Sequence, residues 1–198
     1  MGYSALILAG GKGKRLGYQE KALIDINGKP LISYVIDNLS KVVDKIIISV
    51  RDKAQASLFN MDYRFAYDSY KNKGPLAGIL SGLEVCEDEY CFICGCDMPF
   101  INEEVVKLLF SRSKNYEATI PRWDDGFIEP LHAVYKCKPM IRETKKAIQR
   151  GETIILSPIF KLDVNYIALE EIKKIDPMLR TFININTFED IRKIKNVH

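Results

Sequence analysis

The chain has 198 residues, of which 47% are hydrophobic, and its 29 Lys and Arg against 26 Asp and Glu give a formal net charge of +3. This size and apolar content predict a globular protein that buries a full core in one large domain. The near balance of charge argues against a dedicated nucleic-acid-binding protein, and the sequence shows neither an apolar run long enough to span a membrane nor a cleavable signal pattern at its N-terminus.

The first predicted strand runs into a basic loop rich in glycine. Residues 5–9 are all apolar, as is typical of a strand buried on both faces. The residues that follow include Gly10, Gly11, Gly13 and Gly17, the cations Lys12, Lys14 and Arg15, and then Lys21. Glycine lets backbone N–H groups approach a ligand, and the cations supply charge for a polyphosphate. The stretch predicts a phosphate-binding loop, although its spacing fits neither the P-loop nor the dinucleotide fingerprint, and an ordinary surface loop is the alternative.

Strands and helices then alternate through the first half of the chain. The apolar spacing predicts strands at 22–26, 45–50, 63–67 and 90–95 and helices at 30–43, 52–59, 76–85 and 102–111. Asn27-Gly28 indicates a tight turn, and Asn102 is a candidate helix cap. This rhythm predicts parallel βαβ units and an α/β fold with a mostly parallel central sheet.

The alternation of predicted strands and helices is less regular in the second half of the chain. The pattern there predicts strands at 117–121, 131–136, 164–169 and 182–187, and helices at 139–149 and from 188 to about 195. An irregular piece at 122–130 separates the first two of these strands. No internal repeat, low-complexity segment or linker interrupts the chain, so we expect a single domain over residues 1–198.

Two carboxylates stand where predicted parallel strands end. Asp68 follows the strand at 63–67, and Asp97 follows the fully apolar strand at 90–95. Ligands of open parallel sheets gather at the carboxyl ends of the strands. An ionised carboxylate there must meet solvent, a cation or a metal, and a carboxylate beside phosphates is a usual ligand of Mg²⁺. Asn184 and Asn186 could add carbonyl oxygens, while a capping or solvent-exposed role for Asp97 is the ordinary alternative.

A second glycine-containing loop opens a predicted helix. It contains Gly74, Pro75, Leu76 and Gly78, at a helix start that favours an anion or a base edge. Taken alone, it is equally well an ordinary loop-to-helix connection. Together with the first glycine loop and Asp97, it predicts a site for a nucleoside triphosphate and Mg²⁺.

The cysteines do not indicate a metal site. If residues 90–96 form a strand, Cys91 points to the face opposite Cys94 and Cys96, so these thiols cannot converge on one ion, and we expect buried small hydrophobic side chains. The five cysteines lack the spacing of a disulfide framework and fit a reducing compartment, so we expect a cytoplasmic protein.

Two further side chains are candidates for substrate contact. His132 lies in a predicted strand, where a packed or hydrogen-bonded role is the main expectation and a substrate contact the alternative. Trp123 lies in the irregular piece and could line a pocket for a flat ligand, or simply sit at a rim.

Six short motifs occur in an order that matches a known family. They are Leu8-Ala-Gly-Gly with Arg15, Gly17 and Lys21; Asn27-Gly-Lys-Pro-Leu31; Gly74-Pro-Leu-Ala-Gly78; Cys96-Asp-Met-Pro99; Glu129-Pro-Leu-His-Ala-Val-Tyr135; and Asn184-Ile-Asn-Thr187. With them the chain closely resembles the molybdenum cofactor guanylyltransferases, from about residue 4 to 192. The resemblance implies a nucleotidyltransferase with a Rossmann-like three-layer sandwich.

The resemblance also implies an activity and roles for residues. The reaction would transfer GMP from GTP to the terminal phosphate of molybdenum-bearing molybdopterin, release pyrophosphate and use Mg²⁺, with molybdoenzymes or cofactor chaperones as further partners. Residues 1–100 would bind the nucleotide and residues 101–198 the acceptor. The nucleotide contacts would be Leu8, Ala9, Gly10, Gly11, Asp68, Gly74, Pro75, Leu76 and Gly78, with Arg15 and Lys21 on the phosphates and Asp97 on Mg²⁺.

Some positions depart from the family pattern. Ile48-Ser49-Val50 stands where asparagine is common, Glu20 where aspartate commonly precedes the lysine, and Glu152-Thr153 where an arginine often follows the glycine. The alternatives are a related transferase acting with CTP, or on a sugar or cobinamide phosphate, and a non-catalytic module that binds guanine nucleotide or delivers cofactor.

Overall fold

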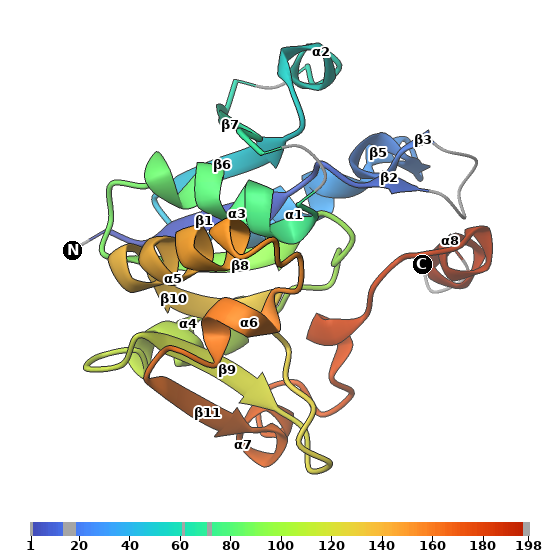
Figure 1. The fold of residues 1–198 in the computed structure, drawn as a ribbon. Coiled ribbons are helices and arrows are strands. Elements are labelled where there is room, and N and C mark those ends of the chain that lie inside the picture. Colours follow the sequence, from blue (N-terminus) through green and yellow to red (C-terminus); the bar gives the residue numbers. More distant parts are fainter. Residues whose placement is uncertain (1, 14–18, 61, 71–72, 196–198) are drawn as a thin grey trace.

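A seven-stranded sheet runs through the middle of the computed structural model, which describes residues 2–13, 19–60, 62–70 and 73–195 (Figure 1). The strand order is β11-β9-β10-β8-β1-β6-β7. The strands are β1 (Ser4–Leu8), β6 (Lys45–Val50), β7 (Arg64–Tyr67), β8 (Tyr90–Gly95), β9 (Ala118–Arg122), β10 (His132–Lys136) and β11 (Val164–Ala168). Strand β10 runs antiparallel to β8 and β9, and the other neighbouring pairs are parallel. The expected mostly parallel sheet is confirmed.

Helices cover both faces of this sheet. Helices α3 (Pro75–Glu84), α5 (Cys137–Gln149) and α6 (Leu156–Ile159) lie in front of it in Figure 1 and pack on the face that carries Leu6 and Ile93. Helices α1 (Leu31–Leu39), α4 (Glu103–Ser111) and α7 (Leu169–Lys173) pack on the opposite face, which carries Ile7 and Phe92. The central strand β1 is apolar on both sides because both are covered. The molecule is therefore the three-layer α/β/α sandwich expected from the sequence.

Shorter elements surround the carboxyl edge of the sheet. They are the hairpin of β2 (Lys12–Gly13) and β3 (Gln19–Glu20), a 3₁₀ turn at Lys21–Leu23, the hairpin of β4 (Asp25–Ile26) and β5 (Lys29–Pro30), α2 (Lys53–Ala56), a second 3₁₀ turn at Arg180–Phe182, and α8 (Phe188–Lys195). Asn27 and Gly28 have positive φ angles of 55° and 80°, which confirms the tight turn. Asn102 caps α4 through its side-chain oxygen, as predicted.

Two predicted strands are wrong. The first residues of 22–26 belong to the 3₁₀ turn. Only Asp25–Ile26 form a strand, and they pair with Lys29–Pro30 in a short hairpin. Residues 182–187 alternate isoleucine and asparagine like a strand, but they join no sheet. Ile185 instead donates its backbone N–H to the carbonyl of Asp97 at 2.9 Å and packs in a small cluster with Ile24 and Ile26. The alternation does not mark a buried face, because Ile185 is buried whereas Ile183 is 42% exposed.

The cysteine prediction is confirmed for strand β8. Cys91 packs on one face of the sheet and Cys94 on the other, with Cys96, and all three are buried. Cys86, just after α3, is half-buried. Within the described ranges no three His, Cys, Asp or Glu side chains are grouped so as to hold a metal ion, and no helix there has the length and apolar character to cross a membrane.

Close packing of α3 on β1 depends on Gly82. A Cβ at this position would overlap the side chain of Leu6, which is fully buried. We expect Gly82→Ala to lower the free energy of unfolding by about 1 kcal/mol, because the middle of the overpacking range of about 1–3 kcal/mol exceeds the gain of about 1 kcal/mol in helix propensity. Denaturation in urea measures it. Gly11→Ala is the control, since no residue that the structure describes lies within 4 Å of its Cβ position; equal stability of the two variants would contradict the prediction.

Candidate functional site

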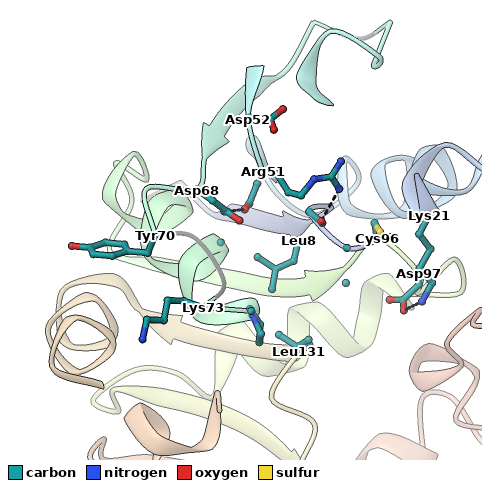
Figure 2. Close-up of a pocket in the computed structure, with 17 residues that line it drawn as sticks. Leu8, Lys21, Arg51, Asp52, Asp68, Tyr70, Lys73, Cys96, Asp97 and Leu131 are labelled. Atoms are coloured by element: carbon teal, nitrogen blue, oxygen red, sulfur yellow. Dashed lines mark hydrogen bonds and ion pairs between the residues drawn. The ribbon is translucent and has the colours of Figure 1, made fainter. Parts of the chain in front are cut away.

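The carboxyl ends of β1, β6, β7 and β8 open on a cavity of about 930 Å³ (Figure 2). Several predicted site residues line it: Leu8, Gly10, Gly11, Lys21, Asp68, Gly74, Pro75, Gly78 and Asp97. Ala9 and Leu76 are buried behind the wall, each with no exposed surface. Arg15 and Gly17 lie outside the residues that the structure describes. The cavity thus gathers residues from four separate strand ends, as expected for a parallel sheet.

Lys21 and Asp97 form an ion pair at one end of the cavity (Figure 2). The Lys21 ammonium also donates to the side-chain oxygen of Asn186 at 2.7 Å. The side chains of Lys21 and Asp97 are 14% and 20% exposed, so the pair is partly shielded from water. Gly95 is needed beside it, because a Cβ there would overlap the Asp97 carboxylate. The side-chain amide N–H of Asn184 donates to the carbonyl of Phe182 at 3.0 Å.

The oxygen ligands present at this end fit a divalent cation. Oxygens of Asp97 and Asn186 converge on one positive group, the Lys21 ammonium. Carboxylate and amide oxygens are ligands that Mg²⁺ accepts, with the remaining positions filled by water and substrate phosphates. The ammonium therefore stands where a hard cation could be held.

Asp68 lies on the other side of the cavity, near Tyr70 (Figure 2). The hydroxyl of Ser49 donates to its carboxylate at 3.4 Å. Burial raises the pKa of the Asp68 carboxyl, and hydrogen bonds from Ser49 and Ser81 oppose that rise. Gly78 leaves room for this pair, because a Cβ there would stand 2.6 Å from the Ser49 hydroxyl.

Helix α3 starts at the wall of the cavity. Gly74 precedes it with φ 55° and ψ −140°, a conformation that is open to glycine and strained for other residues. Pro75 occupies the first position of the helix, where its missing N–H costs nothing. The helix N-terminus is therefore available to a negative group in the cavity.

Other lining residues were not predicted from the sequence. They are Ser49, Arg51, Asp52, Tyr70, Lys73, Gly95, Cys96 and Leu131. Arg51 directly follows β6, and this position alone could have indicated a place at the carboxyl edge of the sheet. Its guanidinium donates to the carbonyl of Gly10 at 2.9 Å and forms an ion pair with Glu20. Gln55, a buried side chain of α2, donates to Glu20 and to the carbonyl of Ala9.

His132 is packed among other side chains, which confirms the main expectation from the sequence. The ring is fully buried and meets the rings of Phe92 and Phe182 edge-on, with Nε2 3.2 Å from the hydroxyl of Thr181. Burial lowers the pKa of His132 to about 3, so the ring is neutral. Trp123 donates its indole N–H to Glu129 at 2.7 Å. A substrate contact by Trp123 stays a prediction.

Known proteins resemble this chain along nearly its whole length. A family model described as a MobA-like NTP transferase domain matches residues 5–161. Curated relatives named "Probable molybdenum cofactor guanylyltransferase" include one from Methanosarcina mazei, 44% identical over 96% of this chain and 89% of the relative, and one from Natronomonas pharaonis, 32% identical over 97% and 96%.

Solved structures agree with this match. The structure of molybdopterin-guanine dinucleotide biosynthesis protein A from Archaeoglobus fulgidus superimposes with a TM-score of 0.85 at 32% identity, covering 98% of this chain and 97% of that one. The bifunctional IspDF of Campylobacter jejuni superimposes with a TM-score of 0.72 at 15% identity over 98% of this chain and 54% of that one, a likeness of fold alone.

Removing the half-buried charge of Asp68 should stabilise the fold in a pH-dependent way. Because burial raises the pKa of this carboxyl above its unfolded value, its ionised form weakens folding once the pH rises through the folded pKa. We expect Asp68→Asn to melt at a higher temperature than the wild type at pH 7, and this advantage to shrink as the pH falls to about 3, below the unfolded pKa. Differential scanning calorimetry across this range measures it.

The control for this prediction is Asp62→Asn, at an exposed position. Its melting temperature should follow that of the wild type at every pH. If Asp68→Asn melts at or below the wild-type temperature at pH 7, the Asp68 charge does not oppose folding.

Proposed function

The chain belongs to the MobA-like NTP transferase family, and on that basis we propose that it transfers GMP from GTP to the terminal phosphate of molybdenum-bearing molybdopterin. The observation that carries this proposal is the cavity in which Lys21 and Asp97 face the start of the glycine loop. Curated relatives named as molybdenum cofactor guanylyltransferases, 44% and 32% identical, support the choice of nucleotide and acceptor.

The reaction is an in-line substitution at the α-phosphorus of GTP. An oxygen of the acceptor phosphate forms the new P–O bond, the bond from the α-phosphorus to the bridging oxygen breaks, and pyrophosphate leaves with that electron pair. Nucleophile and leaving group are both anions, so the protein has to align them and offset their repulsion. Lys21 supplies a cation at the site, and Arg15 is proposed as a second one.

The remaining contacts of the nucleotide are proposed from the cavity walls. Leu8, Ala9 and Gly10 would hold the guanine and ribose, and the backbone N–H groups of Gly10 and Gly11 would approach the phosphates. Asp68 would accept hydrogen bonds from the nucleoside. The loop from Gly74 to Gly78, with Pro75 and Leu76, would complete the wall at the N-terminus of α3.

Asp97 and Asn186 would hold Mg²⁺, with Asn184 as a further proposed ligand. When bound, the ion would supply positive charge that offsets the repulsion of the reacting phosphates. The acceptor phosphate is already ionised at neutral pH, so no side chain has to remove a proton from the nucleophile. The buried, neutral His132 fits a mechanism without a general base.

We assign residues 1–100 to nucleotide binding and residues 101–198 to acceptor binding within one domain. The glycine loop, Asp68 and Asp97 all belong to the first part. We further propose a cytoplasmic location, with molybdoenzymes or cofactor chaperones receiving the product.

The nucleotide preference can be measured without the acceptor. We expect GTP with Mg²⁺ to raise the melting temperature by about 5–10 °C at about 100 times its Kd, because a ligand that binds the folded state stabilises it by mass action. CTP, ATP and UTP at the same concentration should give smaller shifts. A larger shift with CTP would instead indicate a cytidylyl-transferring enzyme.

Asp97 should be essential for turnover. We expect Asp97→Ala to lower kcat by about a thousandfold, the scale of losing one well-placed electrostatic group at a phosphoryl centre. Pyrophosphate release at saturating GTP, Mg²⁺ and acceptor measures it. Asp62→Asn is the control and should keep wild-type turnover. If Asp97→Ala retains more than about a tenth of the wild-type rate, the assignment of Asp97 is refuted.

A further inference from the structure

Three side chains tie together the two stems of the glycine loop. We call Glu20, Arg51 and Gln55 the loop clamp. Arg51 donates through Nη1 to the carbonyl of Gly10, which precedes the basic part of the loop, at 2.9 Å; this is the bond drawn from Arg51 in Figure 2. The same nitrogen donates at 3.0 Å to Glu20, which follows the basic part of the loop. Gln55 repeats the connection: its amide donates to the carbonyl of Ala9 and to Glu20, both at 2.8 Å.

The clamp is rigid at Gln55. This side chain is 2% exposed, and its amide oxygen accepts the backbone N–H of Arg51 at 2.8 Å. Asp52 caps the short helix α2 by accepting the backbone N–H of Gln55 at 2.8 Å. Gln55 does not line the cavity, and its side-chain oxygen and nitrogen are both engaged with protein groups. It can therefore affect a ligand only through the residues it holds.

Peptide geometry turns this clamp into an orienting device. The structure has no cis peptide bond among its described residues, and in a planar trans peptide the N–H points away from the C=O. The carbonyls of Ala9 and Gly10 face the clamp, so the N–H groups of Gly10 and Gly11 point away from it. Both glycines line the cavity, and no described residue lies within 4 Å of the Cβ position of Gly11. Neither N–H donates a hydrogen bond to any part of the chain that the structure describes.

From this geometry we infer that Glu20, Arg51 and Gln55 are positioning residues that aim the N–H groups of Gly10 and Gly11 at the phosphates of the nucleotide. Successive backbone N–H groups held in a fixed direction form a concave site for anions. The inference rests on the proposed function in that the anion is a nucleoside triphosphate, but it does not depend on which base is bound. Because the clamp acts on the phosphates, its loss should matter more as the ligand carries more of them.

Gln55→Met tests this inference, because it keeps the length of the side chain and removes the hydrogen bonds. Titration calorimetry with GMP, GDP and GTP in Mg²⁺ should give a GTP Kd about tenfold weaker than that of the wild type, the scale of one well-oriented hydrogen bond. The loss should decrease from GTP to GDP and nearly vanish for GMP. Gln149→Met, an exposed glutamine at the end of α5, is the matched control and should bind all three like the wild type.

Arg51→Lys separates positioning from direct contact, since Arg51 itself lines the cavity. Lysine keeps the charge but cannot hold Gly10 and Glu20 in a fixed fork. Positioning predicts a loss for GTP like that of Gln55→Met, with GMP unaffected. If Arg51→Lys binds GTP normally, or if Gln55→Met weakens GMP and GTP equally or neither, the inference is wrong.

The outcomes also distinguish this inference from the proposed function. If the wild type binds CTP more tightly than GTP and Gln55→Met weakens CTP but not CMP, the clamp stands and the guanylyl assignment fails. If the wild type binds GTP and the variants lose affinity without regard to phosphate number, the assignment stands and the clamp fails. If the wild type binds no nucleoside triphosphate, both fail.

Discussion

The backbone hydrogen bonds between β1 and its neighbouring strands continue beyond the last residue of β1, and the geometry of the site depends on this continuation. The backbone N–H of Ala9 donates to the carbonyl of Ser49 at 2.9 Å, and that of Cys96 donates to the carbonyl of Leu8 at 3.2 Å. These two bonds carry the sheet register into the loops that follow β6, β1 and β8. They place the first glycine of the loop between Arg51 on one side and Asp97 on the other, so the position of these charges depends on a strand whose first four residues are fully buried.

The far end of the chain completes the same site. The segment after the second 3₁₀ turn brings Asn186 to Lys21, across 165 residues of sequence. It is held there by the backbone bond from Ile185 to Asp97 and by a small apolar cluster in which Ile185 and Ile191 meet Ile24 and Leu31. This cluster is separate from the two cores on the sheet faces, so the polar end of the cavity depends on packing of its own.

Much of this architecture follows from local patterns in the sequence. Fully apolar runs located β1, β6 and β8, helical spacing located α1, α3 and α4, and the position of Asp97 followed from the end of β8. The pattern failed at 182–187, because isoleucine and asparagine alternate there as in a strand although only Phe182 and Ile185 are buried. It also missed Gln55, whose burial arises from partners 35 and 46 residues away that no local pattern can report.

The charges of the site are paired in a way that suits a highly charged ligand. Lys21 and Arg51 are each paired with a carboxylate of the protein, Asp97 and Glu20, on either side of the first glycines. The four side chains are 14–29% exposed, so both pairs are partly shielded from water, and each cation there needs a negative partner. A phosphate can take the place of the Asp97 carboxylate beside Lys21 because it also supplies negative charge, whereas Arg51, which also holds a backbone carbonyl, has a structural reason to stay where it is. One pair is suited to exchange partners and the other to remain fixed.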